Sequence, residues 1–194
     1  MPAKRPIILA SASPRRQGLL RQIGLEFATV PSREPERFEP GLAPSRLVIS
    51  LAQQKAREVA RKHPNALIIA ADTIGVVGRS IIAKPRSAYE ACEMLALLSG
   101  KCHRVITGYT ILEAATGKMR SKAVVTRVYI KRLSNTEIAN YVGSGEPLDK
   151  AGAYGIQGLG AAIVEKIEGD YYNVVGLPLN ALAKSLKAFG IRVL

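Results

Sequence analysis

The sequence predicts an α/β protein, α+β mixed, in which a mixed β-sheet is flanked by helices. Three observations lead to this fold class. Short apolar, β-branched segments alternate with helical segments that begin at capping residues. Several expected strands follow one another directly, as only antiparallel strands joined by short turns can do. The order of elements therefore differs from a doubly wound sheet, in which helices separate parallel strands.

Hydrophobic periodicity and capping residues place the elements along the chain. Two helices are expected to open with a capping box, Ser87 with Glu90 and Ser134 with Glu137. The expected elements in order are a strand at 6–10, a helix from the cap Ser13 through Pro14 to Gly24, a helix over about 44–62, a buried strand at 66–73 ending on Asp72, a hairpin at 74–85 ending on Lys84 and Pro85, a helix at 87–100, a long hairpin at 102–131, a helix at 134–142, a strand at 162–167 and a helix over about 178–189.

Length and composition fit one domain over residues 1–194. A hydrophobic content of 47% and a charged content of 22% are ordinary for a soluble globular protein. No apolar run reaches the roughly 18 residues that span a bilayer, and the run from Ile7 to Ala10 is too short for a signal peptide. We therefore expect a cytoplasmic protein without a membrane partner. The two cysteines, Cys92 and Cys102, form no zinc or disulfide motif and are expected to be small buried residues.

The net charge of +13 is the most conspicuous feature of the composition. It predicts an acidic partner, such as nucleic acid, a phosphorylated small molecule or an anionic surface. The charge is spread along the chain, and no run of five like charges occurs. A solvated basic surface is the alternative reading of this excess.

Arg15 and Arg16 stand in the first turn of the expected first helix. A positive charge there is unfavourable by roughly 0.3–1 kcal/mol, because the helix N-terminus is itself positive. An anion held by backbone N–H groups, serine hydroxyls and the two guanidinium groups would remove this conflict. The pattern predicts a phosphate site, and two arginines that face solvent are the alternative.

One carboxylate and two lysines stand at the ends or edges of buried elements. Asp72 ends an apolar strand, where ligand sites of α/β proteins usually lie, and Thr73 adds a hydroxyl that can orient water or substrate. Lys84 precedes a proline that stiffens its backbone, and Lys55 falls in the apolar stripe of the second helix. With the arginines, these residues predict a site for a triphosphate and a metal. The alternatives are a capping role for Asp72 and snorkelling lysines.

Two loops carry further polar groups. Glu34, Glu36 and Glu39 can bring a carboxylate to a divalent cation, because Mg²⁺ prefers carboxylate, phosphate and water oxygens. Neutralisation of the neighbouring arginines is the alternative.

The second loop, DKAGAYGIQG at 149–158, is dense in glycine. Gln157 offers an amide donor and acceptor suited to reading the edge of a base, and Tyr154 is expected to border a planar group. An ordinary flexible loop is the alternative.

Seven segments occur in the order and spacing of one known family. They are ASASPRRQGLL, LAQQKA, AADT, AKP, LSGKCHRVITG, EPLDKAGAYGIQG and VVGLPL. They run from residue 8 to about 186 and resemble the Maf family, the septum-formation-inhibitor-like nucleoside triphosphate pyrophosphatases. The resemblance implies a Maf/ITPase-like fold with a strongly twisted mixed sheet flanked by helices and an active-site cleft between two lobes.

The resemblance also implies hydrolysis of a nucleoside triphosphate to the monophosphate and diphosphate with a divalent metal, Mg²⁺ or Mn²⁺. The ending AYGIQG resembles the branch that acts on dTTP and UTP, and modified pyrimidine nucleotides are included in this expectation. House-cleaning of the nucleotide pool, a link to cell division arrest and a homodimer are further implications.

Two other functions stay open. A related branch of the family acts on 7-methyl-GTP, so the substrate can be a purine nucleotide. A basic nucleic-acid-binding or septum-regulating protein without turnover would account for the charge. Aromatic residues make up only 5% of the chain, and no basic stripe is interleaved with aromatics, so no specific nucleic acid is expected.

The resemblance assigns roles residue by residue. Asp72 matches the proton acceptor, and Lys55 and Lys84 complete the expected catalytic set. Glu36 and Asp72 match the groups that hold the metal. The remaining matches are Ser11 and Arg16 for phosphate binding and Arg15, Thr73 and Gln157 for substrate choice. The chain departs from the family pattern at Arg33 and Pro35, where acidic residues are frequent, and at Gly75, where a bulkier residue is usual.

Overall fold

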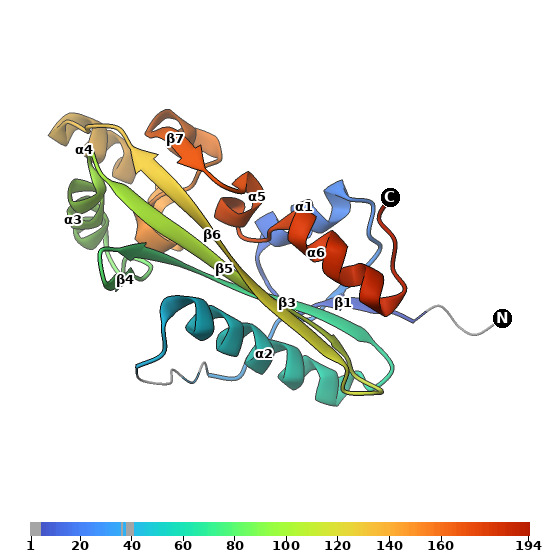
Figure 1. Cartoon of the computed structure of the whole chain (residues 1–194). Coiled ribbons are helices and arrows are strands. Elements are labelled where there is room, and N and C mark those ends of the chain that lie inside the picture. Colours follow the sequence, from blue (N-terminus) through green and yellow to red (C-terminus); the bar gives the residue numbers. More distant parts are fainter. Residues whose placement is uncertain (1–4, 36, 38–40) are drawn as a thin grey trace. The chain divides into compact units, whose positions relative to one another are not determined.

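The computed structural model describes residues 5–35, 37 and 41–194. The elements in chain order, labelled where there is room in Figure 1, are β1 (Ile7–Leu9), α1 (Pro14–Gln22), β2 (Ala28–Thr29), α2 (Pro44–Lys62), β3 (Leu67–Val77), β4 (Ser80–Ile82), α3 (Ala88–Leu98), β5 (Cys102–Glu113), β6 (Met119–Ile130), α4 (Asn135–Gly143), the 3-10 helices η1 (Glu146–Asp149), η2 (Ala151–Ala153) and η3 (Gly158–Ala162), β7 (Val164–Glu168), α5 (Tyr171–Val175), α6 (Leu179–Leu186) and the 3-10 helix η4 (Lys187–Phe189).

The strands form one sheet in the order β2-β1-β3-β5-β6-β7, with β4 paired to β3. Strand β1 runs parallel to β2 and to β3, whereas β4 is antiparallel to β3 and β7 is antiparallel to β6. The mixed α/β fold with hairpins is therefore confirmed. Within the described residues, no helix has both the length and the apolar character that a membrane span requires.

The chain divides into two compact units. The first comprises residues 1–72, 107–124 and 176–194, and the second comprises residues 73–106 and 125–175. Each of the long strands β3, β5 and β6 contributes residues to both units, because a boundary falls inside each of them. The single domain and the cleft between two lobes that we expected from the sequence stay predictions.

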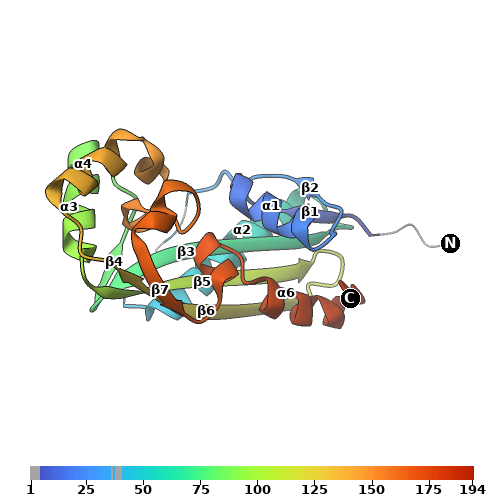
Figure 2. The same ribbon diagram turned by 90° about the horizontal axis from the view of Figure 1, so that it is seen from above.

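In the first unit, α2 covers one face of the strands and α1 and α6 cover the other, as the views in Figure 1 and Figure 2 agree. Two neighbouring residues of β5, Gly108 and Tyr109, face these opposite layers, because side chains alternate between the two faces of a strand. A Cβ on Gly108 would lie 2.5 Å from the backbone carbonyl carbon of Val48 in α2. The hydroxyl of Tyr109 instead donates to the carbonyl of Ala181 in α6 at 2.8 Å.

The α2 face is buried by small and branched apolar residues. The predicted inward residues Val48, Leu51, Ala52 and Val59 are all buried, which confirms the helical stripe. The cluster beneath α2 consists of Ile8, Ala10, Ala56, Val59, Ala66, Ile68, Ala70 and Leu112. Alanines on both the helix and the strands let the backbones approach closely, and this fixes the helix over β3.

The second unit has its own core, with α3 and α4 packed together. The capping box of α4 is confirmed, since the side chains of Ser134 and Glu137 each bond the other's backbone N–H. Only half of the box at α3 forms. Ser87 accepts from the N–H of Glu90 at 3.1 Å, but the Glu90 carboxylate accepts from the backbone N–H of Arg86 at 2.8 Å.

Two sequence predictions are wrong at the level of local structure. The strand expected to end on Asp72 continues to Val77, because β-branched apolar residues resume at Ile74 and pair with β4. Asp72 therefore lies in the middle of a strand. Cys102 is exposed and Cys92 only partly buried, so neither is the buried residue that we expected.

Candidate active site

The first turn of α1 follows β1 directly and is fixed by its cap. The Oγ of Ser13 accepts the backbone N–H of Arg16 at 3.4 Å, and Pro14 occupies the first helical position, as predicted. The guanidinium of Arg16 turns back toward β1. Its Nη1 donates to the Oγ of Ser11 at 3.2 Å, and its Nε donates to the carbonyl of Gly176 at 2.9 Å. The alternative of a solvent-facing arginine is therefore wrong for Arg16.

Lys55 of α2 and Asp72 of β3 form an ion pair with an Nζ–Oδ1 distance of 2.6 Å. Their side chains are only 16% and 13% exposed. An ion pair shielded in this way is screened by salt less than a surface pair. Because a carboxylate is planar, fixing one oxygen of Asp72 also fixes the direction of the other, which retains acceptor capacity for a water proton.

The parallel pairing of β1 with β3 places the Arg16–Ser11 hydrogen bond near the Lys55–Asp72 ion pair along the sheet. Leu9 of β1 lies opposite Ile69 of β3, and the N–H of Ala10 donates to the carbonyl of Ile69 at 2.8 Å. The chain that leads from β1 to Ser11 therefore runs beside the part of β3 that leads to Asp72. Ligand sites of α/β proteins commonly lie beyond the carboxyl end of a parallel strand such as β1.

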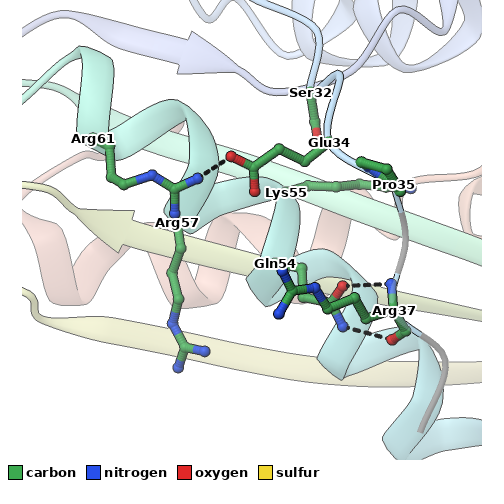
Figure 3. A pocket seen from close by; sticks show the side chains of 8 residues that line it. All are labelled: Ser32, Glu34, Pro35, Arg37, Gln54, Lys55, Arg57 and Arg61. Atoms are coloured by element: carbon green, nitrogen blue, oxygen red, sulfur yellow. Dashed lines mark hydrogen bonds and ion pairs between the residues drawn. The ribbon is translucent and has the colours of Figure 1, made fainter.

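A pocket of about 200 Å³ lies between α2 and the loop that precedes it, as Figure 3 shows. It is lined by Ser32, Glu34, Pro35, Arg37, Gln54, Lys55, Arg57 and Arg61. Four of these side chains are cationic and one, Glu34, is acidic and paired with Arg61. We expected Glu34 to bind a metal or to neutralise its neighbours in the loop, and its ion-pair partner instead comes from α2. The excess of positive charge suits an anionic ligand.

Glu58 holds this loop to α2. The residue is only 2% exposed, and its carboxylate accepts the hydroxyl of Ser32 and the backbone N–H groups of Arg33 and Glu34, the last two at 3.0 and 3.1 Å. Burial by itself would raise the pKa of Glu58, but these donors and the nearby Lys62 hold that pKa below its ordinary value.

Gln54 provides a second attachment on the same helix. Its side-chain amide donates to the carbonyl of Arg37 and accepts from the N–H of Arg37, both at 2.9 Å. Sequence reasoning missed Glu58, although one signal was present. An acidic residue at the edge of an apolar helical stripe needs buried donors, and the loop supplies them.

We expect Glu58→Gln to reduce the free energy of unfolding at pH 7 by about 1–3 kcal/mol, because the new amide turns N–H donors toward buried donors. A pKa lowered by folding stabilises the protein above the unfolded value of about 4.3 and loses that effect as the pH falls through the folded value. The difference between wild type and variant should therefore shrink below about pH 4. Urea unfolding at several pH values measures it, with the exposed Glu165→Gln as control. Equal effects of the two substitutions would contradict the anchoring role.

The other residues that the sequence predicts for the site differ in their exposure and lie in both units. Arg15 is half-buried in the first turn of α1, and Thr73 is half-buried next to Asp72 in β3. Glu36 and Glu39 lie outside the described residues. Lys84 and Gln157 are exposed residues of the second unit.

Lys84 and the glycine-dense loop meet within the second unit. The N–H of Gly152 donates to the carbonyl of Ala83, the residue before Lys84, at 3.0 Å. Gln157 precedes η3 and stands at its N-cap. The catalytic role of Lys84 and the base-reading role of Gln157 stay predictions.

Tyr154 is not available to border a ligand. It is 5% exposed, and its hydroxyl is hydrogen-bonded to the Nε2 of His103 at 2.7 Å inside the core of the second unit. Burial lowers the pKa of His103 to about 4, so this imidazole is neutral near pH 7. Our expectation for Tyr154 is wrong because this part of the loop is itself buried, with Gly152 and Ala153 also in the interior, and the ring packs there against His103.

The excess of positive charge in the pocket and the position of Ser11 and Arg16 beyond the carboxyl end of β1 suit an α/β protein with a phosphorylated ligand. The family model described as Maf-like protein matches residues 6–189, and the chain belongs to this family. The resemblance inferred from the seven segments is thus confirmed.

Several relatives carry the name dTTP/UTP pyrophosphatase. The one from Desulforamulus reducens is 46% identical over 189 residues, which cover 97% of this chain and 99% of that protein. The one from Methanosarcina barkeri is 48% identical over 190 residues, which cover 97% of this chain and 96% of that protein. Among solved structures, a HAM1 protein from Coxiella burnetii matches 95% of this chain and 100% of its own, with a TM-score of 0.55 and 18% identity. This last similarity concerns the fold alone.

Proposed function

We propose that this protein hydrolyses dTTP and UTP to the monophosphate and diphosphate. The observation that carries the proposal is similarity of 46–48% over nearly the whole chain to proteins named for that activity. The ion pair between Lys55 and Asp72 and the cationic pocket beside it support the proposal. The purine-directed and nucleic-acid-binding alternatives have no comparable support.

In this reaction a water oxygen forms a bond to the α-phosphorus, and the bond from that phosphorus to the oxygen bridging to the β-phosphorus breaks. The diphosphate leaves with the electron pair of that bond. Asp72 takes the proton of the attacking water through the carboxylate oxygen that Lys55 does not bind. Lys55 offsets the negative charge of Asp72, so that a highly anionic substrate can approach it.

Cationic groups that are already held in place stabilise the charge of the transition state with little reorganisation. Arg16 is such a group, because Ser11 and the Gly176 carbonyl fix its guanidinium at the start of α1. We assign Lys84 to the same task. Arg15, Thr73 and Gln157 are assigned to the choice of substrate.

We further propose a divalent cation, Mg²⁺ or Mn²⁺, as cofactor. The described residues contain no cluster of three or more His, Cys, Asp or Glu side chains that could hold a metal ion. Asp72 offers one oxygen ligand, which fits Mg²⁺, an ion usually held by one or two carboxylates together with substrate phosphates and water. Glu36, the second expected ligand, lies outside the described residues. The bound ion would neutralise phosphate charge.

A panel of triphosphates tests the proposal. The purified protein is incubated with dTTP, UTP, CTP and 7-methyl-GTP in Mg²⁺, and the diphosphate is measured as phosphate after inorganic pyrophosphatase is added. We expect dTTP and UTP to be the fastest substrates, and we expect EDTA to remove turnover until Mg²⁺ or Mn²⁺ is restored. A folded protein that leaves every nucleotide intact, or that prefers 7-methyl-GTP, would contradict the proposal. Turnover that persists in EDTA would overturn the metal requirement alone.

A homodimer, a cytoplasmic location, a part in cleaning the nucleotide pool and a link to cell division arrest stay predictions from the sequence. None of them is needed for the chemistry proposed for Asp72 and Lys55.

A further inference from the structure

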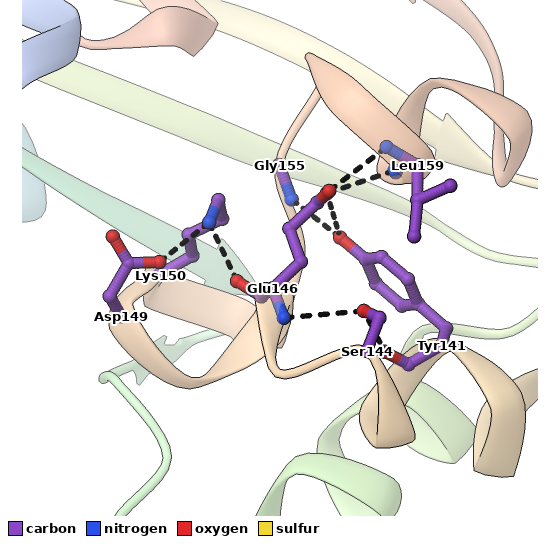
Figure 4. Close-up of polar contacts among 8 residues, drawn as sticks. Tyr141, Ser144, Glu146, Asp149, Lys150, Gly155 and Leu159 are labelled. Atoms are coloured by element: carbon purple, nitrogen blue, oxygen red, sulfur yellow. Dashed lines mark hydrogen bonds and ion pairs between the residues drawn. The ribbon is translucent and has the colours of Figure 1, made fainter.

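Glu146 lies at the centre of a hydrogen-bond network in the second unit, shown in Figure 4. One carboxylate oxygen accepts the hydroxyl of Tyr141 at 2.8 Å and the N–H of Gly160 at 3.0 Å. The other oxygen accepts the N–H of Leu159 at 2.9 Å. A single side chain of η1 therefore joins α4 to the first turn of η3.

The same network reaches the other end of the segment 155–160. The hydroxyl of Tyr141 accepts the backbone N–H of Gly155 at 3.1 Å while it donates to Glu146. The segment is thus held at Gly155 on one side and at Leu159 and Gly160 on the other. Gln157, an exposed residue, lies between the two attachments.

The backbone of this segment is packed tightly against the carboxylate. Gly158 has a φ of +66°, and a Cβ at that position would lie 2.5 Å from Oε2 of Glu146. A Cβ on Gly160 would lie 1.9 Å from the carbonyl oxygen of Gly155. Two glycines therefore permit a shape in which the segment closes on Glu146, and a side chain at either position would force it apart.

The negative charge of Glu146 suits a side chain that accepts several hydrogen bonds at once. Burial would raise the pKa of its carboxyl, but the N–H groups of Gly160 and Leu159, the Tyr141 hydroxyl and the charge of Lys150 hold the pKa below its ordinary value. Near neutral pH the side chain is an ionised acceptor facing three donors. A glutamine of the same size would present N–H groups toward these donors.

We propose that Glu146 is a positioning residue that holds Gln157 in place and thereby sets the base selectivity of the enzyme. This inference rests on the proposed function, because it assigns Gln157 to reading the base. Uracil and thymine present a carbonyl oxygen and an N–H where cytosine presents an amino group and a ring nitrogen. An amide that is fixed in position can tell these edges apart, and an amide that moves can satisfy either.

The main test is Glu146→Gln with dTTP and CTP as substrates. We expect the ratio of kcat/KM for dTTP to that for CTP to fall about tenfold, which corresponds to roughly 1.4 kcal/mol of lost discrimination. The loss should appear mainly as a higher KM for dTTP, with kcat within a few fold, since the network bonds the segment around Gln157 and none of the groups assigned to proton transfer. Glu137→Gln, which alters the carboxylate that caps α4, is the matched control and should leave the ratio unchanged.

A double-mutant cycle separates positioning from general damage. If Glu146 acts through Gln157, then Glu146→Gln should not change the dTTP to CTP ratio any further in a Gln157→Ala background. Additive effects of the two substitutions would overturn the inference, as would an unchanged ratio in the single variant.

Hydrogen exchange provides a readout that does not depend on turnover. The amides of Leu159 and Gly160 should exchange at least about tenfold faster in Glu146→Gln than in the wild type. If that variant does not fold, Tyr141→Phe removes the shared hydroxyl while keeping the ring, and Gly155 should then exchange faster. Unchanged exchange in a folded variant overturns the positioning role. A wild type that hydrolyses neither dTTP nor UTP overturns the proposed function, and with it the assigned selectivity, even where the exchange rates change as expected.

Discussion

Asp72→Asn is expected to remove turnover of dTTP and UTP while the fold and nucleotide binding remain. The asparagine oxygen can still accept the Lys55 ammonium, whose nitrogen lies 2.6 Å from Oδ1 in the wild type. The amide nitrogen that replaces the other oxygen cannot take a proton from water. General-base catalysis contributes typically 10²–10⁴-fold, and we expect kcat to fall by about this factor. Because Asp72 is also proposed to hold the divalent cation, the dissociation constant of the nucleotide is expected to change little when the metal is saturating.

Kinetics and binding measured on the same sample decide this prediction. A titration of dTTP in Ca²⁺, with thermal unfolding alongside, reports binding and fold, and Glu165→Gln shows the effect of an exposed acid-to-amide change. If Asp72→Asn turns over dTTP within about tenfold of the wild-type rate, another group is the base. If the variant loses activity together with its fold, the ion pair serves stability.

Elements set by local signals were predictable from the sequence. The start of α1 at Pro14 follows from the cap Ser13, and the box of Ser134 with Glu137 begins α4, because both signals lie within four residues of the helix end. The hairpin of β5 and β6 follows from β-branched runs on either side of a turn. Each of these depends on neighbours in the chain.

Features that depend on distant partners were not predictable in the same way. The pair Asp72 and Thr73 indicates the end of a strand, but β3 continues because the residues after Ile74 pair with β4. The Asp72 carboxylate is accommodated inside the strand by Lys55 of another element. The anchoring role of Glu58 depends on loop donors that lie 24 to 26 positions away. The buried contact of Tyr154 with His103 depends on a strand 51 positions away.

The family motifs predicted more of the candidate site residues than the hydrophobic periodicity of the sequence did. The family resemblance named Lys55 and Asp72 separately, and the structure adds that they form one pair. Local rules are most often broken at functional positions, and a charged residue in the middle of an apolar strand is such a case. The roles of Glu58 and Glu146 were not predicted, because the sequence does not show which backbone N–H groups will surround an acidic residue in a polar or mixed segment.

Gly108→Ala is expected to reduce the free energy of unfolding by about 3 kcal/mol or more, at the upper end of the usual effect of overpacking. The added Cβ would meet the carbonyl carbon and oxygen of Val48 at 2.5 and 2.6 Å and the nitrogen of Ile49 at 2.7 Å. All three are backbone atoms, so no side-chain rotation relieves the clash. The helix α2 must move away from β5.

The same substitution should also reduce activity, because α2 carries Lys55 and the partner Asp72 lies on the sheet that α2 covers. Urea unfolding measures the stability, and kcat for dTTP measures the site. Gly18→Ala is the matched control, since among the described residues the Cβ it adds meets no atom within 4 Å apart from its chain neighbours and its own helix backbone. A helical glycine replaced by alanine is expected to gain about 0.5–1 kcal/mol. If Gly108→Ala is as stable as the wild type, then α2 does not pack as closely on β5 as described. The burial of the ion pair between Lys55 and Asp72 would then have to be revised as well.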